Sequence, residues 1–269
     1  MVNNQNKLII LICHYNNLEG LNASILSINE SIEVDILIVD DGSIEKPNLA
    51  SLKEKYKGGD IFLEILPKNM GVGMATNHGL EVILKMNYEF TGRLDCGDTN
   101  HTDKYSKQIT YLREHPEIKL VGTFVNMVDT NGKLLFVLKH PTTYDSIIKK
   151  IHLNSTFVNS SVIYYVDILK DVGLFPEKYH RNGEDFAFFF NVIKKFKVAN
   201  MPEVLLDYVV DPNSLSSTRR VEQVKARISI LKSHFYFGFY PIYGLIRNYI
   251  LLLAPRDFTT FIKKIINKN

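Results

Sequence analysis

Cysteine is scarce in this chain, and the charge is nearly balanced. The two cysteines, Cys13 and Cys96, lie too far apart in the sequence to indicate a disulfide framework or a zinc cluster. The formal net charge of +3 comes without any long block of basic residues, which argues against a nucleic-acid partner. The low cysteine content and the absence of a long basic block therefore predict an ordinary folded protein.

The N-terminus also lacks a targeting signal. Residues 1–7 and the short apolar run after them have neither the long apolar region nor the small-residue cleavage site of a signal peptide, which predicts a cytoplasmic location. Hydrophobic residues make up 45% and charged residues 23% of the 269 positions, as is usual for a folded soluble protein. This length suits one large domain, or one domain with an appendage.

The first hundred residues alternate between apolar strands and amphipathic helices. Residues 8–13 form a continuous apolar run, which is typical of a strand buried on both faces of a parallel sheet. Alternation of this kind predicts an α/β fold with a doubly wound, mostly parallel sheet. The expected strands are 8–13, 34–39, 61–66 and 88–94, and the expected helices are 18–28, 46–57 and 75–86.

The second half of the chain is less regular. Segments 119–128 and 133–138 flank Asp129-Thr130-Asn131-Gly132, which is a hairpin signal and predicts a small antiparallel part of the sheet. The other expected elements are helices at 101–115, 144–152 and 166–172, a strand at 159–165, an aromatic helix at 184–196, one or two strands within 198–210, and a helix from 219 to about 237.

Carboxylates follow two of the expected strands. Asp40 and Asp41 end the second strand, and Asp95 and Asp98 follow the fourth, with Gly97 between them. Ligands bind at the carboxyl ends of the strands in open α/β sheets, and two hard oxygen donors at one point suit Mg²⁺ or Mn²⁺ that is shared with phosphate oxygens. A plain turn followed by a helix cap explains the same residues without a ligand.

Two further motifs lie at expected helix starts. Gly71 and Gly73 let the backbone approach a phosphate at a helix N-terminus, but their spacing matches neither the dinucleotide fingerprint nor Walker A. Glu184 and Asp185 open the aromatic helix, where the helix dipole favours acids for structural reasons alone. An acid on a rigid helix start is also a candidate general base, and the residues themselves leave both interpretations open.

Four motifs, in this order and at this spacing, resemble the family 2 inverting glycosyltransferases. They are LIVDDGS at 37–43, KNMGVGMATNHGL at 68–80, RLDCGD at 93–98 and VGLFPEKYHRNGEDFAFF at 172–189. The resemblance implies the GT-A fold and a nucleotide-sugar donor of the UDP, GDP or dTDP type. It also implies a saccharide or lipid-linked saccharide acceptor, and a role in assembling a bacterial surface polysaccharide such as an O-antigen or a capsule.

The resemblance extends to the roles of single residues. It implies Asp185 as the catalytic base with Glu184 beside it, and Asp95 with Asp98 as ligands of Mg²⁺ or Mn²⁺. The expected enzyme is a metal-dependent hexosyltransferase that inverts the anomeric carbon in a single displacement. The expected donor-binding residues are His14, Tyr15, Asn16, Asp40, Asp41, Asn69, Gly71, Asn77, Arg93, Asp95, Arg219 and Arg220.

One position departs from the family's pattern. The metal motif of the family is usually Asp-x-Asp, often with a further Asp, and Gly97 replaces the middle acid here. Either Asp98 takes over the coordination, or metal binding is weak.

The segment 214–220 resembles the family's mobile loop, in which Arg219 or Arg220 would close on the diphosphate through its forked guanidinium. The simpler alternative is that Arg219 and Arg220 are solvated cations at the start of a helix.

The C-terminal segment 235–254 is almost entirely apolar or aromatic. It is about long enough to span a bilayer, but Pro241 and the Arg247-Asn248 pair near its middle argue against a span. Cations such as Lys232 beside aromatic stretches suit helices that lie in the membrane interface, on the inner face of the plasma membrane. A helix pair that covers the core, or an interface of a homodimer, explains the pattern equally well.

The expected domain organisation follows from these segments. A GT-A catalytic domain is expected over 1–218, with a nucleotide-binding half at about 1–100 and an acceptor half at about 101–218, and a helical segment over 219–269.

Two other functions stay open at this point. A nucleotidyltransferase also places acids on an α/β sheet, but it would need a basic, glycine-rich loop where this chain has His14-Tyr15-Asn16-Asn17. A non-catalytic nucleotide-sugar-binding or membrane-adaptor protein would tolerate Gly97. The sequence names neither the sugar, the base nor the acceptor.

Overall fold

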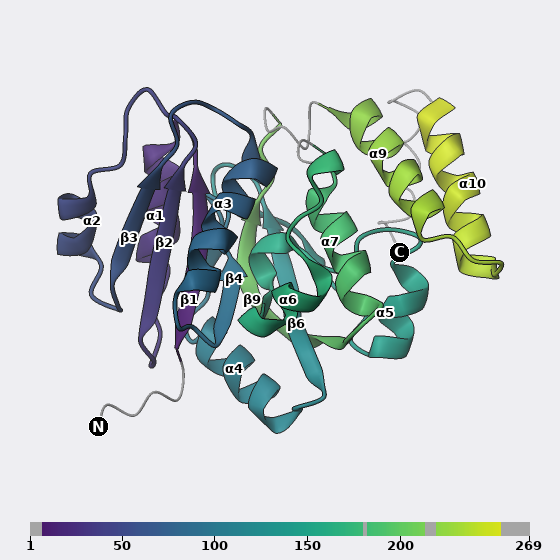
Figure 1. Cartoon of the computed structure of the whole chain (residues 1–269), viewed down its shortest axis with the longest axis horizontal. Helices are drawn as coiled ribbons and strands as arrows, with labels where there is room; N and C mark the ends of the chain where they lie inside the picture. Colours follow the sequence, from purple (N-terminus) through teal and green to yellow (C-terminus); the bar gives the residue numbers. More distant parts are fainter. Residues whose placement is uncertain (1–6, 180–181, 213–218, 254–269) are drawn as a thin grey trace.

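A single mixed sheet forms the centre of the computed structural model, which describes residues 7–179, 182–212 and 219–253 (Figure 1). Within these ranges the strands follow the order β3-β2-β1-β4-β8-β6-β9-β5, and β7 pairs with β6 outside that path. The strands are β1 (Leu8–His14), β2 (Val34–Asp40), β3 (Ile61–Ile65), β4 (Phe90–Arg93), β5 (Thr99–Asn100), β6 (Ile118–Val128), β7 (Leu134–Leu138), β8 (Ile163–Tyr165) and β9 (Lys197–Val209).

The first four strands pair in parallel, as the alternation predicts. Strand β1 is buried on both faces: Ile9 and Leu11 belong to one hydrophobic cluster, and Leu8, Ile10 and Ile12 belong to the other. Because successive side chains of a strand point to opposite faces, a continuous apolar run fits a sheet that is covered on both sides. The prediction of a buried parallel sheet is therefore confirmed for this half.

Antiparallel pairs enter the sheet from β8 onward. Strand β8 runs antiparallel to both β4 and β6, and the expected hairpin is formed by β6 and β7. The predicted strand at 159–165 is correct only for β8, since residues 159–161 form a 3₁₀ turn. In that turn both the amide and the hydroxyl of Ser161 bond to the Val158 carbonyl, and such local bonds compete with a strand ladder. Segment 197–209 is one strand.

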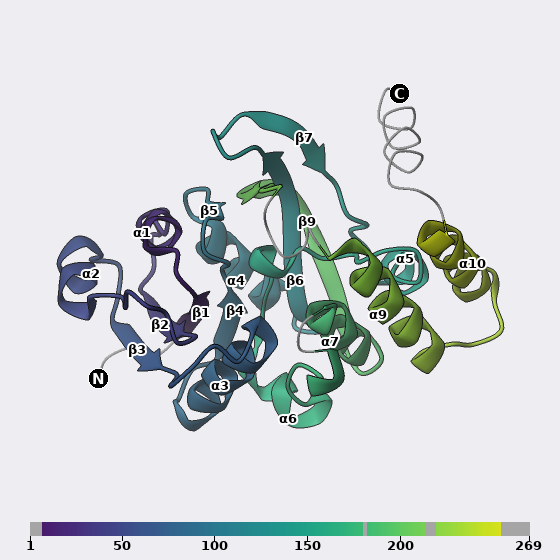
Figure 2. The same ribbon diagram turned by 90° about the horizontal axis from the view of Figure 1, so that it is seen from above.

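Helices cover both faces of the sheet (Figures 1 and 2). Helix α2 is shorter than predicted because Asn48 caps it and accepts a hydrogen bond from the Ser51 amide. The helices are α1 (Leu18–Leu26), α2 (Leu49–Lys55), α3 (Val72–Lys85), α4 (Lys104–Glu114), α5 (Tyr144–Lys150), α6 (Leu169–Val172), α7 (Glu184–Ile193), α9 (Arg220–Ser233) and α10 (Phe239–Leu253).

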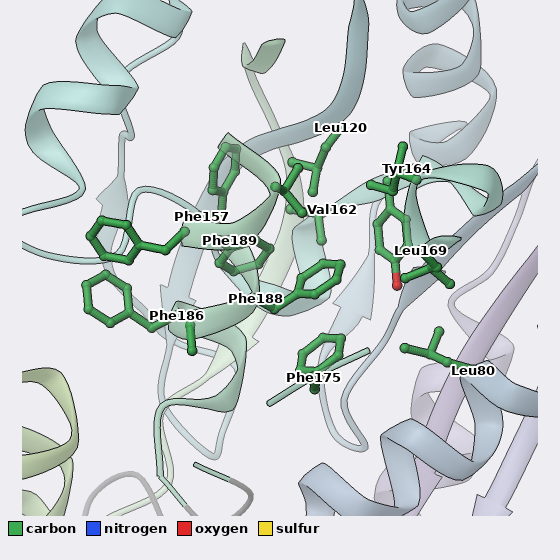
Figure 3. Packing of buried hydrophobic residues seen from close by; sticks show 14 of the residues in the cluster. Leu80, Leu120, Phe157, Val162, Tyr164, Leu169, Phe175, Phe186, Phe188 and Phe189 are labelled. Carbon is green, nitrogen blue, oxygen red and sulfur yellow. The ribbon is translucent and has the colours of Figure 1, made fainter. Parts of the chain in front are cut away.

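Aromatic packing holds α7 against the sheet (Figure 3). Phe188 stacks on Phe175 with ring centroids 4.5 Å apart, and Phe189 packs on Phe157 at 5.0 Å. Burial of a Phe side chain contributes about 1.5–3 kcal/mol, so several such residues hold α7 firmly. The acidic start of α7 therefore has a defined position.

The C-terminal segment folds into two helices, and the first of them ends before the predicted end at about residue 237. Helix α9 ends at Ser233, a turn follows, and α10 begins at Phe239. The two helices lie side by side at one end of the molecule, beside α5 (Figures 1 and 2). Among the described residues, no helix is both long and apolar enough to cross a membrane.

Candidate functional site

The carboxyl ends of β1, β2 and β4 meet at one edge of the sheet. His14 lies opposite Asp40 in the β1–β2 pair, and Leu11 lies opposite Arg93 in the β1–β4 pair. The acids predicted from strand exits therefore start from neighbouring strands. This edge is the usual ligand site of an open α/β sheet.

His14 and Asp40 bond to each other inside the protein. The His14 Nδ1 lies 2.7 Å from Asp40 Oδ1, and neither side chain is exposed. The His14 Nε2 accepts the amide of Asn17, so Nδ1 carries the proton that is donated to Asp40. The second oxygen of Asp40 accepts the Ser43 amide at 3.1 Å. In this structure both residues support the strand ends, and their predicted contact with the donor stays a prediction.

Asp41 fastens the turn after β3 to the end of β2. Its Oδ1 accepts the Met70 amide at 2.7 Å, and its Oδ2 accepts the Gly71 amide at 2.9 Å. Burial raises the pKa of this carboxyl above its ordinary value, and the two amide bonds oppose that rise. Gly42 has φ +71° and lies so close to the Lys68 backbone that an added Cβ would be 2.4 Å away. Asp41 and Gly42 together bring the glycine turn beside β2.

The remaining residues predicted at the nucleotide side have different surroundings. Tyr15 and Asn69 are exposed, so their side chains are accessible to a ligand. Asn16 has a left-handed backbone, and its side-chain oxygen accepts the Ile44 amide at 2.9 Å. The Asn77 amide bonds both the carbonyl and the N–H of Phe175, which ties α3 to the segment before α7.

Arg93 is the buried cation of the site. Its Nη2 lies 2.6 Å from Asp95 Oδ1, and its Nη1 donates to the Thr76 hydroxyl at 2.8 Å. Asn159, with its amide oxygen turned toward Arg93, accepts from Nη1 at 3.2 Å and from Nε at 3.3 Å. Burial by itself would lower the pKa of Arg93, but the nearby charges of Asp95 and of the acidic pair at the α7 start raise it. The guanidinium stays charged.

The turn from Asp95 to Asp98 is held by two buried serines. Ser24 Oγ donates to the Asp98 carbonyl at 2.8 Å and accepts the Gly97 amide at 2.9 Å. Ser160 Oγ accepts the Asp95 amide at 3.1 Å and donates to Asp98 Oδ2 at 2.5 Å. A Cβ at Gly97 would have nothing within 4 Å, but φ +104° disfavours any side chain there. The turn is therefore built for glycine at this position.

The two acids of this turn differ in exposure. Asp98 is buried, its Oδ1 accepts the Val209 amide at 3.1 Å, and burial, followed by the charge of Asp95, raises its pKa to about 7. The Asp95 side chain keeps 35% of its surface exposed. Lys104 lies behind the turn, where burial lowers its pKa to about 7 and its ammonium bonds the Ser160 carbonyl. Of the two, only Asp95 keeps part of its side chain exposed.

The acidic start of α7 lies within electrostatic reach of the same turn. Burial raises the pKa of Asp185, and so does the charge of Asp95, whereas the charges of Arg93 and Arg227 oppose the rise. Burial and the charge of Asp185 raise the pKa of Glu184 to about 7. A carboxylate with a raised pKa is a stronger proton acceptor. Glu184 and Asp185 therefore lie close enough to Asp95 to be affected by its charge, and Asp98 shares the turn with Asp95.

Arg227 from α9 is a cation that the sequence did not single out. Its guanidinium lies 5.9 Å from the ring of Phe186, next to Asp185, and burial lowers its pKa. Of the two arginines that were predicted, Arg220 donates to the Leu251 carbonyl of α10 at 2.8 Å, and Arg219 precedes the first turn of α9. The segment 214–218, predicted as a mobile loop, lies outside the described residues.

The fit of a divalent cation depends on Asp95. Within the described part of the chain, no group of three or more His, Cys, Asp and Glu side chains could hold a metal ion by itself. Mg²⁺ is usually held by only one or two carboxylates together with phosphate oxygens, and the partly exposed side chain of Asp95 fits that arrangement. Asp98 bonds protein donors through both oxygens, so its role as a ligand stays a prediction.

Ser160 and Arg227 could not have been found by inspecting the sequence. Ser160 lies in a segment that was predicted as a strand, and its two partners are 62 and 65 residues away. Arg227 is a regular helix residue without a motif around it.

Comparison with known proteins places these motifs in a family. The sequence model of the family described as Glycosyl transferase family 2 matches residues 9–172. The amylovoran biosynthesis glycosyltransferase AmsE of Erwinia amylovora is 24% identical over 80% of this chain and 77% of that protein. The UDP-Gal:alpha-D-GlcNAc-diphosphoundecaprenol beta-1,3-galactosyltransferase of Escherichia coli is 24% identical over 87% of this chain and 86% of its own length.

Solved structures share the fold at low identity. S. aureus TarS 1–349 in complex with UDP-GlcNAc superposes with a TM-score of 0.63 at 16% identity, over 91% of this chain and 72% of that one. Another S. aureus TarS chain is covered over only 43% of its length. The mannosyltransferase PcManGT from Pyrobaculum calidifontis, in complex with GDP-Man and Mn²⁺, gives 0.61 at 13% identity, over 91% and 69%. These likenesses confirm the GT-A type fold.

Proposed function

Because the chain belongs to glycosyl transferase family 2, we propose that it is an inverting glycosyltransferase that moves a sugar from a nucleotide-diphosphate sugar to an acceptor hydroxyl. The catalytic domain is proposed to extend over 1–218, and the segment 219–269 is proposed as its helical extension. The active site is proposed at the edge where β1, β2 and β4 end, facing the start of α7.

One observation carries this proposal: the acids of two distant motifs act on the same buried arginine. Asp95 pairs directly with Arg93, and the charges of Glu184 and Asp185 also raise the pKa of Arg93. A carboxylate that would face the diphosphate and a carboxylate that would face the acceptor thus lie near the same cation. A displacement at the anomeric carbon needs both groups in one site, because the acceptor hydroxyl attacks while the diphosphate departs.

The nucleoside is proposed to bind at the exits of β1 and β2. Tyr15 presents an exposed aromatic ring there, and Asn16 and Asp41 hold the loops on either side of it. The start of α3, next to Gly71, offers unpaired backbone amides for the diphosphate. His14 and Asp40 are proposed to position these loops from inside the protein.

Asp95 is proposed to hold Mg²⁺ or Mn²⁺ against the diphosphate. The cation would supply positive charge to the departing nucleoside diphosphate. This role suits the partial exposure of the Asp95 side chain. PcManGT was solved with Mn²⁺, which supports the choice of ion.

Asp185 is proposed as the general base. Its raised pKa favours uptake of the proton from the acceptor hydroxyl while that oxygen attacks the sugar. Arg93 and Arg227 hold the carboxylate in its charged form beforehand, since both oppose the effect of burial on its pKa. Glu184 is proposed to sit beside the base and to keep a proton near neutral pH.

The biological role is proposed from the relatives. AmsE is named for amylovoran biosynthesis, and the Escherichia coli relative is named for transfer to a diphosphoundecaprenol-linked sugar. We propose assembly of a bacterial surface polysaccharide on a saccharide or lipid-linked acceptor, by a cytoplasmic enzyme that associates peripherally with the membrane. A UDP, GDP or dTDP sugar is the proposed donor, and the oligomeric state, homodimer included, is left open.

The variant Asp185→Asn tests the proposal, with Glu184→Gln as its matched control. We expect Asp185→Asn to lower turnover by about 10²–10⁴-fold and to leave donor binding intact, whereas Glu184→Gln should reduce turnover less. Donor binding is measured as the rise in Tm with a panel of nucleotide sugars and Mn²⁺. Equal turnover of Asp185→Asn and the unmodified protein would remove the base assignment. Binding without any turnover by the unmodified protein would favour the non-catalytic adaptor.

A further inference from the structure

Helix α10 turns a complete apolar face to the solvent. The seven side chains of this face are between 41% and 84% exposed, although all are large and apolar or aromatic. At 3.6 residues per turn they fall within about a third of the helix circumference. We call them the α10 outer face: Phe239, Ile242, Tyr243, Ile246, Tyr249, Ile250 and Leu253.

Packing on the opposite side fixes the direction of this face. Pro241, Gly244 and Asn248 are buried. Gly244 lies so close to the backbone of His152 that an added Cβ would be 2.0 Å from its carbonyl oxygen. Arg247 donates to the Leu153 carbonyl at 2.8 Å. The helix therefore cannot rotate to bury its outer face without losing these contacts.

The charged residues of the segment that carries this face, 223–256, all have the same sign. The sequence contains no Asp or Glu from Gln223 to Arg256, but this stretch includes Lys225, Lys232 and further arginines. The Lys232 ammonium lies 5.5 Å from the ring of Tyr249, at the border of the outer face. The turn before α10 adds exposed aromatic side chains to the same end of the molecule: Phe235, Tyr236 and Phe237.

We propose that the α10 outer face lies in the surface of a membrane that contains anionic lipid. The 15 residues of α10 are about 22 Å long, which is too short to cross the hydrocarbon core of about 30 Å. A helix with an apolar face, aromatic side chains and cations at its border inserts parallel to the surface. This proposal deepens the membrane association proposed above by naming the surface that makes it.

A second copy of the chain fits this face less well. A two-fold interface would place the same surface of each copy against the other. Lys232 at the border would then approach segment 223–256 of the other copy, which contains cations and no acid to pair with it. Like charges placed opposite each other disfavour association, whereas anionic head groups would attract them.

Vesicle flotation of the full chain tests the proposal without donor or acceptor, so that it can fail independently of the transferase function. Ile250→Glu places an acid in the outer face, and Leu26→Glu on α1 is its matched control. The two side chains are 56% and 55% exposed, and α1 lies at the opposite end of the molecule (Figures 1 and 2). Vesicles contain phosphatidylcholine with or without phosphatidylglycerol.

We expect the unmodified chain and Leu26→Glu to float with phosphatidylglycerol vesicles, and to float much less with pure phosphatidylcholine. Ile250→Glu should weaken binding by about tenfold or more, with an unchanged Tm because the side chain is exposed. Equal flotation of Ile250→Glu and Leu26→Glu would overturn the proposal, and so would equal binding to both vesicle types. Loss of a dimer in Ile250→Glu, with no flotation of the unmodified chain, would assign the face to a second copy.

Discussion

Removing the Ser160 hydroxyl should weaken both the fold and the site. This hydroxyl is fully buried and joins two parts of the acidic turn, since it accepts the Asp95 amide and donates to the Asp98 carboxylate. The variant Ser160→Ala removes both bonds and adds no bulk. Its neighbour Ser161 is equally buried but makes one side-chain bond, to the Val158 carbonyl at 2.8 Å. Ser161→Ala is therefore a matched control.

The expected cost follows from the charges of the partners. A hydrogen bond to a charged group contributes about 1.5–3 kcal/mol and a neutral bond about 1 kcal/mol. Ser160→Ala should thus lower the free energy of unfolding by about 3 kcal/mol, against about 1 kcal/mol for Ser161→Ala. These values apply at pH 8, where Asp98 is ionised because its pKa is about 7.

Urea denaturation at pH 8 measures the two costs, and donor turnover measures the effect on the site. We expect Ser160→Ala to lower turnover at least tenfold at a temperature where it is still folded, because the Asp95 backbone loses its anchor. Ser161→Ala should keep most of its turnover. Equal destabilisation of the two variants would show that the Asp98 bond contributes nothing, and would refute this account of the turn.

Three further results are expected. Burial lowers the pKa of His152 to about 4, so the unfolded chain binds more protons at this residue between pH 6.5 and 4. His152 should therefore cost up to about 3 kcal/mol of stability as the pH drops through this window. His152→Phe should remove that part of the fall in urea titrations and leave the part due to His140 and His234, whose pKa values burial also lowers to about 4. Gly42→Ala should lower Tm strongly because its Cβ would meet backbone at 2.4 Å, whereas Gly132→Ala, at a similar φ in open space, should cost only about 1 kcal/mol. Asp41→Asn should cost about 1–3 kcal/mol, measured by urea denaturation, because one of its two amide donors would lose its acceptor.

Strands, turns and the order of the motifs were readable from the sequence because they are local properties. The run over 8–13 predicts β1, and the hairpin signal at 129–132 predicts the β6–β7 pair. The predicted strand at 159–165 was wrong over its first residues. The apolar pattern gives no sign that the Ser161 hydroxyl bonds the nearby Val158 carbonyl, and such a bond competes with a strand. The helix predicted from 219 to about 237 is correct for α9 but ends earlier, because a turn follows Ser233.

The sequence by itself determined the family, the alternating α/β plan and the acids that are proposed for the site. Only the tertiary structure decided which of these acids face outward. Asp98 turns inward because its oxygens bond a serine 62 residues away and an amide 111 residues away, while Asp95 stays partly exposed beside Arg93. The physical reason is that a carboxylate takes the direction of its hydrogen-bond donors, and those donors come from a 3₁₀ turn and a strand that only folding brings together.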